Sequence, residues 1–448
     1  MSRIAVVTGD VIGDRMAGPA IRAMHVADEL ARHHAVTLVS TAGGTLDGQG
    51  FASVTARGRQ LKRALASAEI VIIQGHAVRD ARWLFASDRI IVADLYDPLH
   101  LEALEQSRSS VIKSRREVVR LSTMVLNEQL IRADFMMCAN EAQRHLWLGH
   151  LAALGRIDVE MYEADPTMRG LLAVCPFGLP SLPPVQRSRP LHDIDGIESG
   201  DHVAIWAGGL YDWLDPLTVI RAMSVLLKTE PTIKLVFLGT VRPDVGGIDM
   251  RMPRQARELA DDLGLTGRNV FFLDGWVPYD KRGDYLLDAH IGVSAHRLHL
   301  ETEFSHRTRM LDYLWAGLPI VSTAGDSWSQ CVSASDLGIS VPAEDPDALA
   351  SALVTLSVEA THTRMRLNVE DARPDLEWSR TLAPLVDFCA APQRAADRIT
   401  QSRIDRQTVL PRGRLRRTVA LMRSSWRRGG PSELAGRVSA RLFSRRVR

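Results

Sequence analysis

The chain has 448 residues, of which 46% are hydrophobic and 24% charged, and its net charge is only +2; these values are typical of a globular protein with two or three domains. Its longest apolar runs, such as residues 70–73, have the length of strands, and the N-terminus lacks a signal peptide's long apolar core, so we expect neither a membrane-spanning helix nor a leader. The four cysteines are scattered without C-x-x-C spacing, which argues against a zinc site or a disulfide framework and indicates a reducing cytoplasm.

The first part of the chain alternates between short apolar runs and amphipathic segments. Strands are expected at residues 3–8, 36–40, 70–74, 89–94, 135–138 and 172–175, and helices at 21–33, 59–68 and 111–133. This alternation predicts a parallel, doubly wound sheet, which binds ligands at the carboxyl ends of its strands. The Pro- and Gly-rich segment PFGLPSLPP then indicates a hinge, so we expect residues 1–180 to form an N-terminal Rossmann-like domain.

The loop after the first strand contains several glycines. Gly9 and Gly13 are four residues apart and the helix is expected only from residue 21, a spacing that does not fit a Rossmann dinucleotide site. No P-loop motif occurs in the chain. Gly18, which precedes Pro19 at the helix start, is the better candidate for close backbone approach to a ligand. The alternative is a glycine needed only for the turn.

The segment after the strand at residues 89–94 places polar side chains at one carboxyl end of the sheet. Tyr96, Asp97 and Glu102 follow this strand closely. Asp97 is the leading candidate for an acid at this end of the sheet. An Asp-Pro turn with a local hydrogen bond explains Asp97 equally well.

Residues 181–375 repeat the pattern and predict a second Rossmann-like domain. Its first strand, 202–207, ends in Gly208 and Gly209, and a helix follows with Asp215 as its cap and Pro216 in its first turn. Further strands are expected at residues 234–239, 270–273, 291–294 and from 320, and helices at 254–263, 281–287, 345–356 and 363–369. His296 and His299 have no third ligand at metal spacing, and we interpret them as polar loop residues.

Residues 299–322 carry the most informative pattern. Glu301 and Glu303 precede an amphipathic helix that we expect to begin at Phe304 or Ser305 and to end at Gly317. Two cations would lie in its first turn, Arg307 and Arg309. Together with the free N–H groups near Ser305 they would suit a diphosphate. The alternative is a solvated face on which both arginines pair with Glu301 and Glu303.

This stretch resembles GT-B glycosyltransferases of the family 4 group, in which a donor-binding helix ends in A-x-G-x-P before a strand. The segment RTRMLDYLWAGLPIV is similar to a bacterial branch that builds surface polysaccharides. The resemblance implies that Asp312 holds the ribose hydroxyls and that the sugar-contacting acid is displaced to Glu303 or Glu301. It also implies that Gly18 faces the donor phosphates. Trp276 lies in an element that resembles the F-x-G-x-V segment, whose backbone reads the nucleobase.

The sequence departs from the family pattern in two places. Gly209 and Asp215 occupy the positions of the basic pair that clamps the donor diphosphate in most of these enzymes, so we expect Arg307 and Arg309 to supply that charge. Tyr96 and Asp97 stand where a His-Asp pair is usual close to the transferred sugar. A histidine role is therefore not expected here, Asp97 is the leading acid on this side, and Tyr96 and Glu102 are candidates for the acceptor side. Trp213 either walls the sugar or base pocket or belongs to the core.

The resemblance implies a glycosyltransferase that moves a sugar from a nucleoside-diphosphate sugar to a lipid-linked carbohydrate acceptor in polysaccharide or glycolipid biosynthesis. It implies retention at the anomeric carbon, no metal and no cofactor beyond the nucleotide-sugar co-substrate. A GT-B phosphorylase and an inactive nucleotide- or sugar-binding scaffold are the alternatives, the latter because the basic clamp and the histidine are both absent.

The C-terminal end differs in composition from the rest of the chain. Residues 376–392 are expected to cross back to the first domain, and residues 393–448 to form a linker and a basic tail. Residues 411–448 contain twelve arginines and one acid, Glu433. Apolar side chains recur at helical spacing among the arginines, at Leu415, Val419, Met422, Trp426, Leu434, Val438 and Leu442. This predicts that Arg412–Arg448 lies on the cytoplasmic face of the inner membrane; a partner-binding helix, disorder and a nucleic-acid tail are alternatives, and no nucleic acid is expected.

Overall fold

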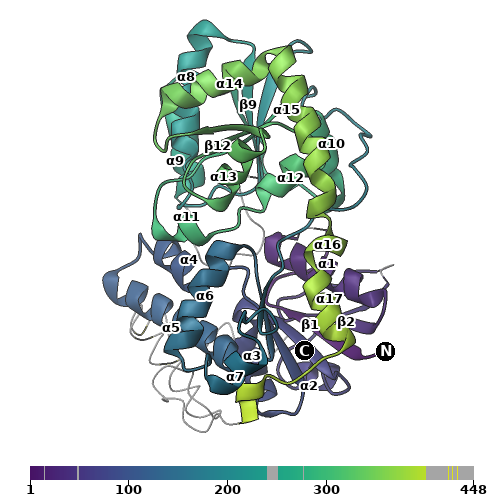
Figure 1. The fold of residues 1–448 in the computed structure, drawn as a ribbon. Coiled ribbons are helices and arrows are strands. Elements are labelled where there is room, and N and C mark those ends of the chain that lie inside the picture. Colours follow the sequence, from purple (N-terminus) through teal and green to yellow (C-terminus); the bar gives the residue numbers. More distant parts are fainter. Residues whose placement is uncertain are drawn as a thin grey trace.

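The computed structural model describes residues 1–14, 16–47, 50–239, 251–275 and 277–399, together with Met422, Trp426 and Pro431. Two domains stand one above the other in Figure 1, each with a parallel sheet between helices. Trp276, the loop at 240–250 and almost all of the predicted tail lie outside the described residues. Within the described residues, no helix is both long and apolar enough to cross a bilayer.

The first domain contains a seven-stranded parallel sheet in the order β3-β2-β1-β4-β5-β6-β7. Its strands are β1 (Arg3–Thr8), β2 (Ala35–Ser40), β3 (Ala52–Thr55), β4 (Ile70–Gln74), β5 (Ile90–Asp94), β6 (Phe135–Cys138) and β7 (Leu172–Val174). Its helices are α1 (Gly18–Ala31), α2 (Arg59–Ala64), α3 (Val78–Ala81), α4 (Leu99–Gln106), α5 (Ile112–Arg132), α6 (Glu141–Ala153) and α7 (Val159–Ala164). Nearly every central strand residue is buried, as expected for a sheet covered on both faces.

The second domain contains a six-stranded parallel sheet in the order β10-β9-β8-β11-β12-β13. Its strands are β8 (His202–Ala207), β9 (Ile233–Leu238), β10 (Val270–Phe272), β11 (Ile291–Ser294), β12 (Ile320–Thr323) and β13 (Gly338–Val341). Its helices are α8 (Pro216–Thr229), α9 (Met252–Asp262), α10 (Arg282–Leu287), α11 (Leu300–Phe304), α12 (Arg309–Ala316), α13 (Ser327–Ala334), α14 (Pro346–Ser357) and α15 (Glu359–Ala372). The predicted pair of doubly wound domains is confirmed.

Helix caps fix the local starts of two elements near the cleft. Asp215 caps α8, accepting a hydrogen bond from the backbone N–H of Thr218 at 3.2 Å, with Pro216 in the first turn as predicted. Asn140 caps α6 by accepting from the N–H of Gln143 at 2.8 Å. Helix α1 begins at Gly18, three residues earlier than predicted, because Pro19 fits a first turn, where its missing N–H is not needed.

The predicted single helix starting at Phe304 or Ser305 is wrong. The segment forms two helices, α11 and α12, separated by residues 305–308. The imidazole of His299 accepts from the N–H of Thr302 and starts α11 early, and Ser305 is extended with its hydroxyl donating to the carbonyl of Thr302. The ends of α12 are as expected: Gly317 adopts a left-handed conformation with φ of 74°.

The chain then returns to the first domain through α16 (Trp378–Thr381) and α17 (Ala383–Ala390), which Figure 1 shows below α15. Trp378 stacks on His25 of α1 with ring centroids 4.7 Å apart, and Phe388 stacks on Phe135 at 4.5 Å. The two domains are therefore joined by the segment at 175–201 and by this crossover, with the cleft between them.

Candidate functional site

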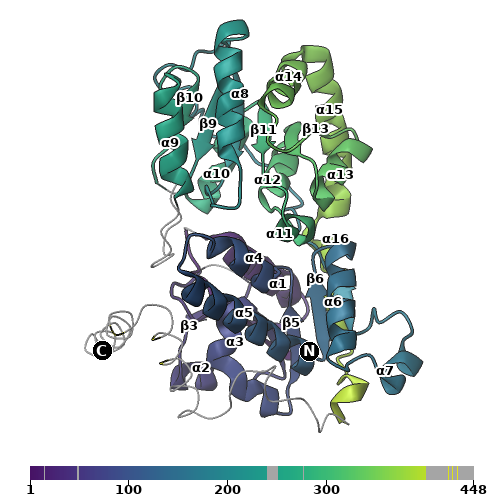
Figure 2. The same ribbon diagram turned by 90° about the vertical axis from the view of Figure 1, so that its left-hand side faces the viewer.

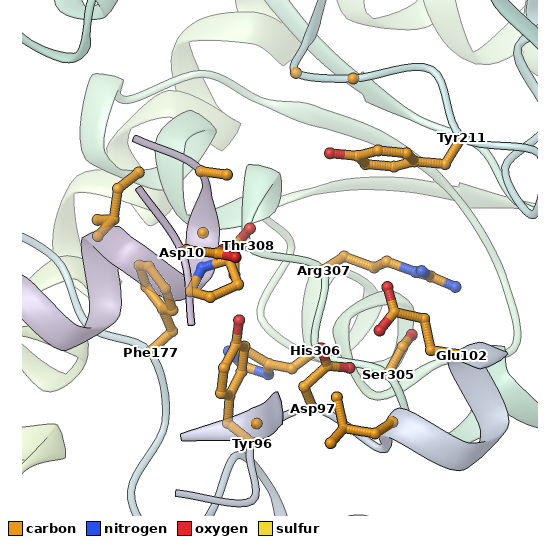
Figure 3. A pocket seen from close by; sticks show the side chains of 18 of the residues that line it. Asp10, Tyr96, Asp97, Glu102, Phe177, Tyr211, Ser305, His306, Arg307 and Thr308 are labelled. Carbon is orange, nitrogen blue, oxygen red and sulfur yellow. The ribbon is translucent and has the colours of Figure 1, made fainter. Parts of the chain in front are cut away.

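The two domains enclose a cavity of about 970 Å³ lined by residues from both of them. The loops at the carboxyl ends of β1, β4 and β5 form its lower wall, and the loop after β8 together with the start of α12 forms its upper wall. Figure 3 shows Tyr211 above Arg307, and Glu102 and Asp97 below Arg307. This is the position at which doubly wound sheets bind ligands.

Arg309 is the central cation of the upper wall. Its Nη2 donates to the carbonyl oxygen of Gly209 at 3.0 Å, and its guanidinium carbon lies 4.4 Å from the centre of the Trp206 ring. The residue is 9% exposed, Nη1 has no hydrogen-bond partner, and no carboxylate among the described residues forms an ion pair with it. Burial lowers the pKa of Arg309 to about 10, so it remains charged at neutral pH. A buried cation without a counter-ion is costly, and an anion bound in the cavity would remove that cost.

Arg307 lies two residues away in a different environment. Its guanidinium binds the Glu301 carboxylate in a two-pronged pair, with Nη1 to Oε1 at 3.0 Å and Nη2 to Oε2 at 2.7 Å. Both side chains are largely buried. The expectation that both arginines lie in the first turn of one helix is wrong, because Arg307 precedes α12. The alternative of pairing with an acid therefore describes Arg307 but not Arg309.

The two candidate acids before the helix also separate. Glu301 lines the cavity beside Arg307, whereas Glu303 is exposed and is not among the lining residues. Ser305 is buried and lines the cavity too. Of the two residues proposed to contact the sugar, the structure brings only Glu301 to the site, because α11 turns its two acids to opposite sides.

Asp312 lines the cavity and is held by an arginine that sequence reasoning missed. Its Oδ1 accepts from Nε of Arg282 at 3.0 Å. The Arg282 guanidinium in turn lies 3.6 Å from the centre of the Tyr279 ring and 4.7 Å from that of Trp315. Arg282 and Asp312 are thirty residues apart, so their spacing carries no signal. Asp312 keeps its second oxygen for another partner.

His306 is a second residue that sequence reasoning missed. It lines the cavity between Ser305 and Arg307, and its ring is tilted against Trp328 at 5.1 Å. Neither ring nitrogen has a hydrogen-bond partner among the described residues, and burial lowers its pKa to about 3. A neutral imidazole at this point can donate or accept one hydrogen bond.

Three glycines line the cleft, and a side chain at two of them would meet a neighbouring residue. A Cβ on Gly18 would lie 3.5 Å from Oγ1 of Thr308, so the start of α1 meets the start of α12 across the cleft. A Cβ on Gly209 would lie 2.9 Å from the ring of Tyr211, closer than atoms can pack. Gly208 has a φ of 112°, which favours glycine. All three line the cavity, and their predicted contact with the donor stays a prediction. Gly209 makes room for Tyr211, and its carbonyl oxygen accepts from Arg309.

Aromatic rings cover the place at which the family pattern has a basic clamp. Tyr211 and Trp213 stack with ring centroids 4.7 Å apart and planes 5° from parallel. Both line the cavity, and Trp213 is 6% exposed. Trp213 is thus both a core residue and part of the wall, which combines the two predicted alternatives. Asp215 caps α8 and contributes no charge to the cavity surface.

The lower wall holds the predicted acceptor-side residues. Tyr96, Asp97 and Glu102 all line the cavity. Burial, and next the charge of Glu102, raise the pKa of Asp97 well above its usual range. When two carboxyl groups share a buried site, one of them keeps its proton at a pH where a free carboxyl would be ionised. The Asp97–Glu102 pair can therefore offer one donor and several acceptors to hydroxyl groups.

Asp94 is not available for such a role. The fully buried Arg22 donates to its Oδ2 at 2.7 Å and also to the carbonyls of Cys175 and Pro176. This neutral pair fixes the carboxyl end of β5 against the end of β7. The guanidinium of Arg22 also lies 5.0 Å from the centre of the Tyr96 ring and holds that wall in place.

Direct hydrogen bonds hold the two walls together. Nε2 of Gln143 donates to the carbonyl of Tyr96 at 2.7 Å and to that of Phe304 at 2.8 Å, which joins α6 to α11. Nδ2 of Asn140 donates to Oγ of Ser327 at 3.1 Å. Asn140 thus caps its helix and also contacts the second domain.

Among the described residues, no three His, Cys, Asp or Glu side chains are grouped as metal ligands would be. His299 caps α11 and contacts the carbonyl of Trp213, in line with the interpretation of a polar loop residue. Metal independence remains a prediction.

Comparisons with known proteins agree with this geometry. Residues 201–358 match the family model described as Glycosyl transferases group 1. The D-inositol 3-phosphate glycosyltransferase of Nocardiopsis dassonvillei is 24% identical over 202 residues, which are 44% of this chain and 46% of that protein. The match thus spans less than half the length of this curated relative.

Solved structures match over both domains. HepE of Anabaena in complex with UDP-glucose has a TM-score of 0.65 at 13% identity, covering 87% of this chain and 100% of that one. Sucrose-phosphate synthase of Thermosynechococcus elongatus has a TM-score of 0.64 at 15% identity, with 87% and 98% covered. WaaG, a glycosyltransferase involved in lipopolysaccharide biosynthesis, has a TM-score of 0.62 at 14% identity, with 87% and 100% covered. These matches confirm the GT-B fold.

Proposed function

We propose that this GT-B protein, in which residues 201–358 match the glycosyl transferases group 1 model, transfers a sugar from a nucleoside-diphosphate sugar to a hydroxyl of a carbohydrate acceptor. One observation carries the proposal: Arg309 is a buried guanidinium in the cleft wall with no carboxylate partner among the described residues. Such a cation has a physical reason to exist if a polyanion binds beside it. The donor diphosphate is that polyanion.

The upper wall supplies the groups that this reaction needs on the donor side. When the bond between the sugar and the diphosphate breaks, negative charge accumulates on the leaving phosphate, and a fixed cation at that point lowers the barrier. Arg309 would contact the diphosphate, with the N–H groups at the start of α12 beside it. Asp312, held by Arg282 at 3.0 Å, would accept hydrogen bonds from the ribose hydroxyls.

Glu301 and Arg307 act together in this scheme. Glu301 would accept from a hydroxyl of the transferred sugar, while Arg307 fixes its orientation through two hydrogen bonds. Because Arg307 is neutralised, it contributes less to diphosphate binding than Arg309. Trp276 remains a candidate for the nucleobase side by resemblance alone.

The lower wall would bind the acceptor. Asp97 and Glu102 supply hydrogen-bond acceptors and one retained proton, which suits neutral hydroxyl groups better than a phosphate group. Tyr96 lines the same wall. Closure of the domains, held by Gln143 and Asn140, would exclude the water that could hydrolyse the donor.

The finer features rest on the family resemblance. They are retention at the anomeric carbon, independence of metal, and a lipid-linked acceptor at the cytoplasmic face of the membrane with the tail Arg412–Arg448 as a contact. A phosphorylase would place free phosphate at Arg309 instead of a nucleotide, and an inactive scaffold would bind without turnover.

Calorimetric titration separates these functions. The full chain is titrated with UDP, GDP, ADP and inorganic phosphate, and release of nucleoside diphosphate from the matching nucleotide sugars is then measured with glycolipid acceptors. A glycosyltransferase binds one nucleoside diphosphate at micromolar levels and releases it faster when an acceptor is present. Tight binding of inorganic phosphate alone indicates a phosphorylase, and absence of all binding contradicts the proposal.

A further inference from the structure

Two aromatic rings pack against the guanidinium group of Arg282. Its central carbon lies 3.6 Å from the centre of the Tyr279 ring and 4.7 Å from that of Trp315. Nε of Arg282 donates to Oδ1 of Asp312 at 3.0 Å, and the Arg282 side chain is only 14% exposed. A planar guanidinium that is packed against two rings cannot change its orientation freely while those rings stay in place. The orientation of Asp312 therefore depends on what holds the rings.

Tyr279 belongs to the second domain, in the short helix η3 (Tyr279–Lys281), but groups of the first domain hold it. Its hydroxyl oxygen lies 2.9 Å from Nε2 of His25 in α1, and its backbone N–H donates to the carbonyl oxygen of Asp14 at 2.9 Å. Burial, and next the charge of Arg282, lower the pKa of His25 to about 3, so the imidazole is neutral at neutral pH. A neutral imidazole can accept the hydrogen of the Tyr279 hydroxyl.

The segments that join the two domains hold the remaining rings. The imidazole of His25 stacks on Trp378 in the crossover, with ring centroids 4.7 Å apart. Nε1 of Trp315 donates to the carbonyl oxygen of Leu182, in the other connecting segment, at 2.8 Å. Figure 1 shows α1 and α16 below α10 and α12 on the same side of the molecule. Each ring that packs against Arg282 is thus held by the first domain or by a connection between the domains.

We propose that the first domain sets the orientation of Asp312 in the donor site. Three positioning residues carry this effect, and they are His25, Tyr279 and Arg282. The inference rests on the proposed function, because it takes Asp312 as the residue that accepts hydrogen bonds from the ribose hydroxyls. The ribose contact is then complete only while the first domain touches Tyr279. When the domains separate, Asp312 loses its fixed orientation, and the nucleoside diphosphate dissociates more readily.

The preference of the donor site for ribose measures this positioning. The full chain is titrated with whichever of UDP, GDP and ADP binds, and with the 2′,3′-dideoxy form of that nucleotide. We expect the wild type to bind the ribose form about tenfold more tightly, since the dideoxy form lacks the hydrogen bonds to the carboxylate. Tyr279→Phe and His25→Leu should each reduce this preference to about threefold or less, chiefly by weakening the binding of the ribose form.

Further variants separate positioning from packing. His25→Gln keeps a hydrogen-bonding group for the Tyr279 hydroxyl without the imidazole ring, and it should restore most of the preference for ribose. His33→Leu removes an exposed histidine just beyond the end of α1 and should leave the preference unchanged. The double variant His25→Leu with Tyr279→Phe should lose no more than His25→Leu alone, because both changes remove the same hydrogen bond. An unchanged preference in both single variants, or losses that add in the double variant, would overturn the proposal.

Hydrogen exchange tests the link between the domains without any nucleotide. In the nucleotide-free chain, His25→Leu should raise the exchange of backbone amides at residues 279–287 severalfold, because η3 and α10 lose a hydrogen bond to the first domain. His33→Leu should not change it. Unchanged exchange in His25→Leu would overturn the proposal. A wild-type chain that binds none of the three nucleotides, while exchange at 279–287 responds to His25→Leu, would overturn only the proposed function.

Discussion

The two walls of the cleft hold their charges differently. On the lower wall the cation Arg22 is neutralised by Asp94 at 2.7 Å. Burial, and next the charge of Glu102, raise the pKa of Asp97 on the same wall. On the upper wall Arg307 is neutralised by Glu301, but Arg309 is buried without a carboxylate partner among the described residues. The position of an uncompensated charge, rather than the number of charged residues, therefore distinguishes the proposed donor wall from the proposed acceptor wall.

The largest expected effect comes from removing the uncompensated charge. Arg309→Met should lower kcat/KM for the nucleotide sugar by about a thousandfold, roughly 4 kcal/mol of transition-state stabilisation, because a preorganised cation at the leaving group is lost. The variant should not lose stability through a carboxylate left without its partner, because no carboxylate among the described residues pairs with Arg309. Arg221→Met, which removes an exposed arginine from α8, is the control and should leave the rate unchanged. Equal activity of the two variants would contradict the comparison of the walls.

Substitution of the neighbouring Arg307 should lower the stability of the folded protein, unlike substitution of Arg309. Arg307→Met leaves Glu301 buried without its partner and should lower the free energy of unfolding by about 3 kcal/mol, measured by urea denaturation. Arg307→Met combined with Glu301→Leu should recover most of that loss, because both charges are then absent. If the double variant were as unstable as the single one, the pair would not be the source of the effect.

The aromatic part of the upper wall offers a steric test. Gly209→Ala would place a Cβ 2.9 Å from the Tyr211 ring and should lower the free energy of unfolding by about 2 kcal/mol through overpacking. In a Tyr211→Ala background the same change should cost less than about 0.5 kcal/mol, since the clash is removed. A double-mutant cycle of thermal unfolding measures the difference. An equal cost in both backgrounds would show that the backbone, not the ring, requires glycine.

The lower wall should respond mainly to pH. The pKa of Asp97 is raised above its ordinary value of 3.8, so the folded state holds its proton more tightly than the unfolded state. Its contribution to stability is therefore present below pH 3.8 and is lost as pH rises towards the folded pKa, with a slope of at most about 1.4 kcal/mol per pH unit. Asp97→Asn should abolish this loss in unfolding measured from pH 4 to 8.

Glu102→Gln is the companion variant for that measurement. It should make the total loss of stability smaller and end that loss at a lower pH, because the charge of Glu102 is the second cause of the raised pKa of Asp97 after burial. A pH dependence that is unchanged in both variants would place the titrating group elsewhere.

The fold could be predicted from the sequence because the buried strands appear as apolar runs. The two strands that were missed, β3 and β13, lie at sheet edges, and their partly exposed residues form no such run. The break between α11 and α12 was missed for a different reason. It depends on side-chain hydrogen bonds of His299 and Ser305, which compete with continuous helix and leave no periodic signal.

The candidate site was predictable in position but not in the state of its charges. The sequence places Arg307 and Arg309 at the cleft, yet only the folded chain shows that Glu301 reaches the first and not the second. Arg282, His306 and Tyr211 come to the site from segments with no distinctive spacing. The sequence does not distinguish Glu301 from Glu303. Only the folded helix α11 shows that Glu301 lines the cavity and that Glu303 is exposed. Trp276 and the tail Arg412–Arg448 lie outside the described residues, and their roles stay predictions.

The most direct test of the donor wall is a crystal structure of the full chain with the nucleoside diphosphate that binds best. We predict a phosphate oxygen within hydrogen-bond distance of the Arg309 guanidinium, ribose hydroxyls at Asp312, and an intact Arg307–Glu301 pair. A diphosphate bound by Arg307 after separation from Glu301, with Arg309 still contacting only the Gly209 carbonyl, would contradict the account.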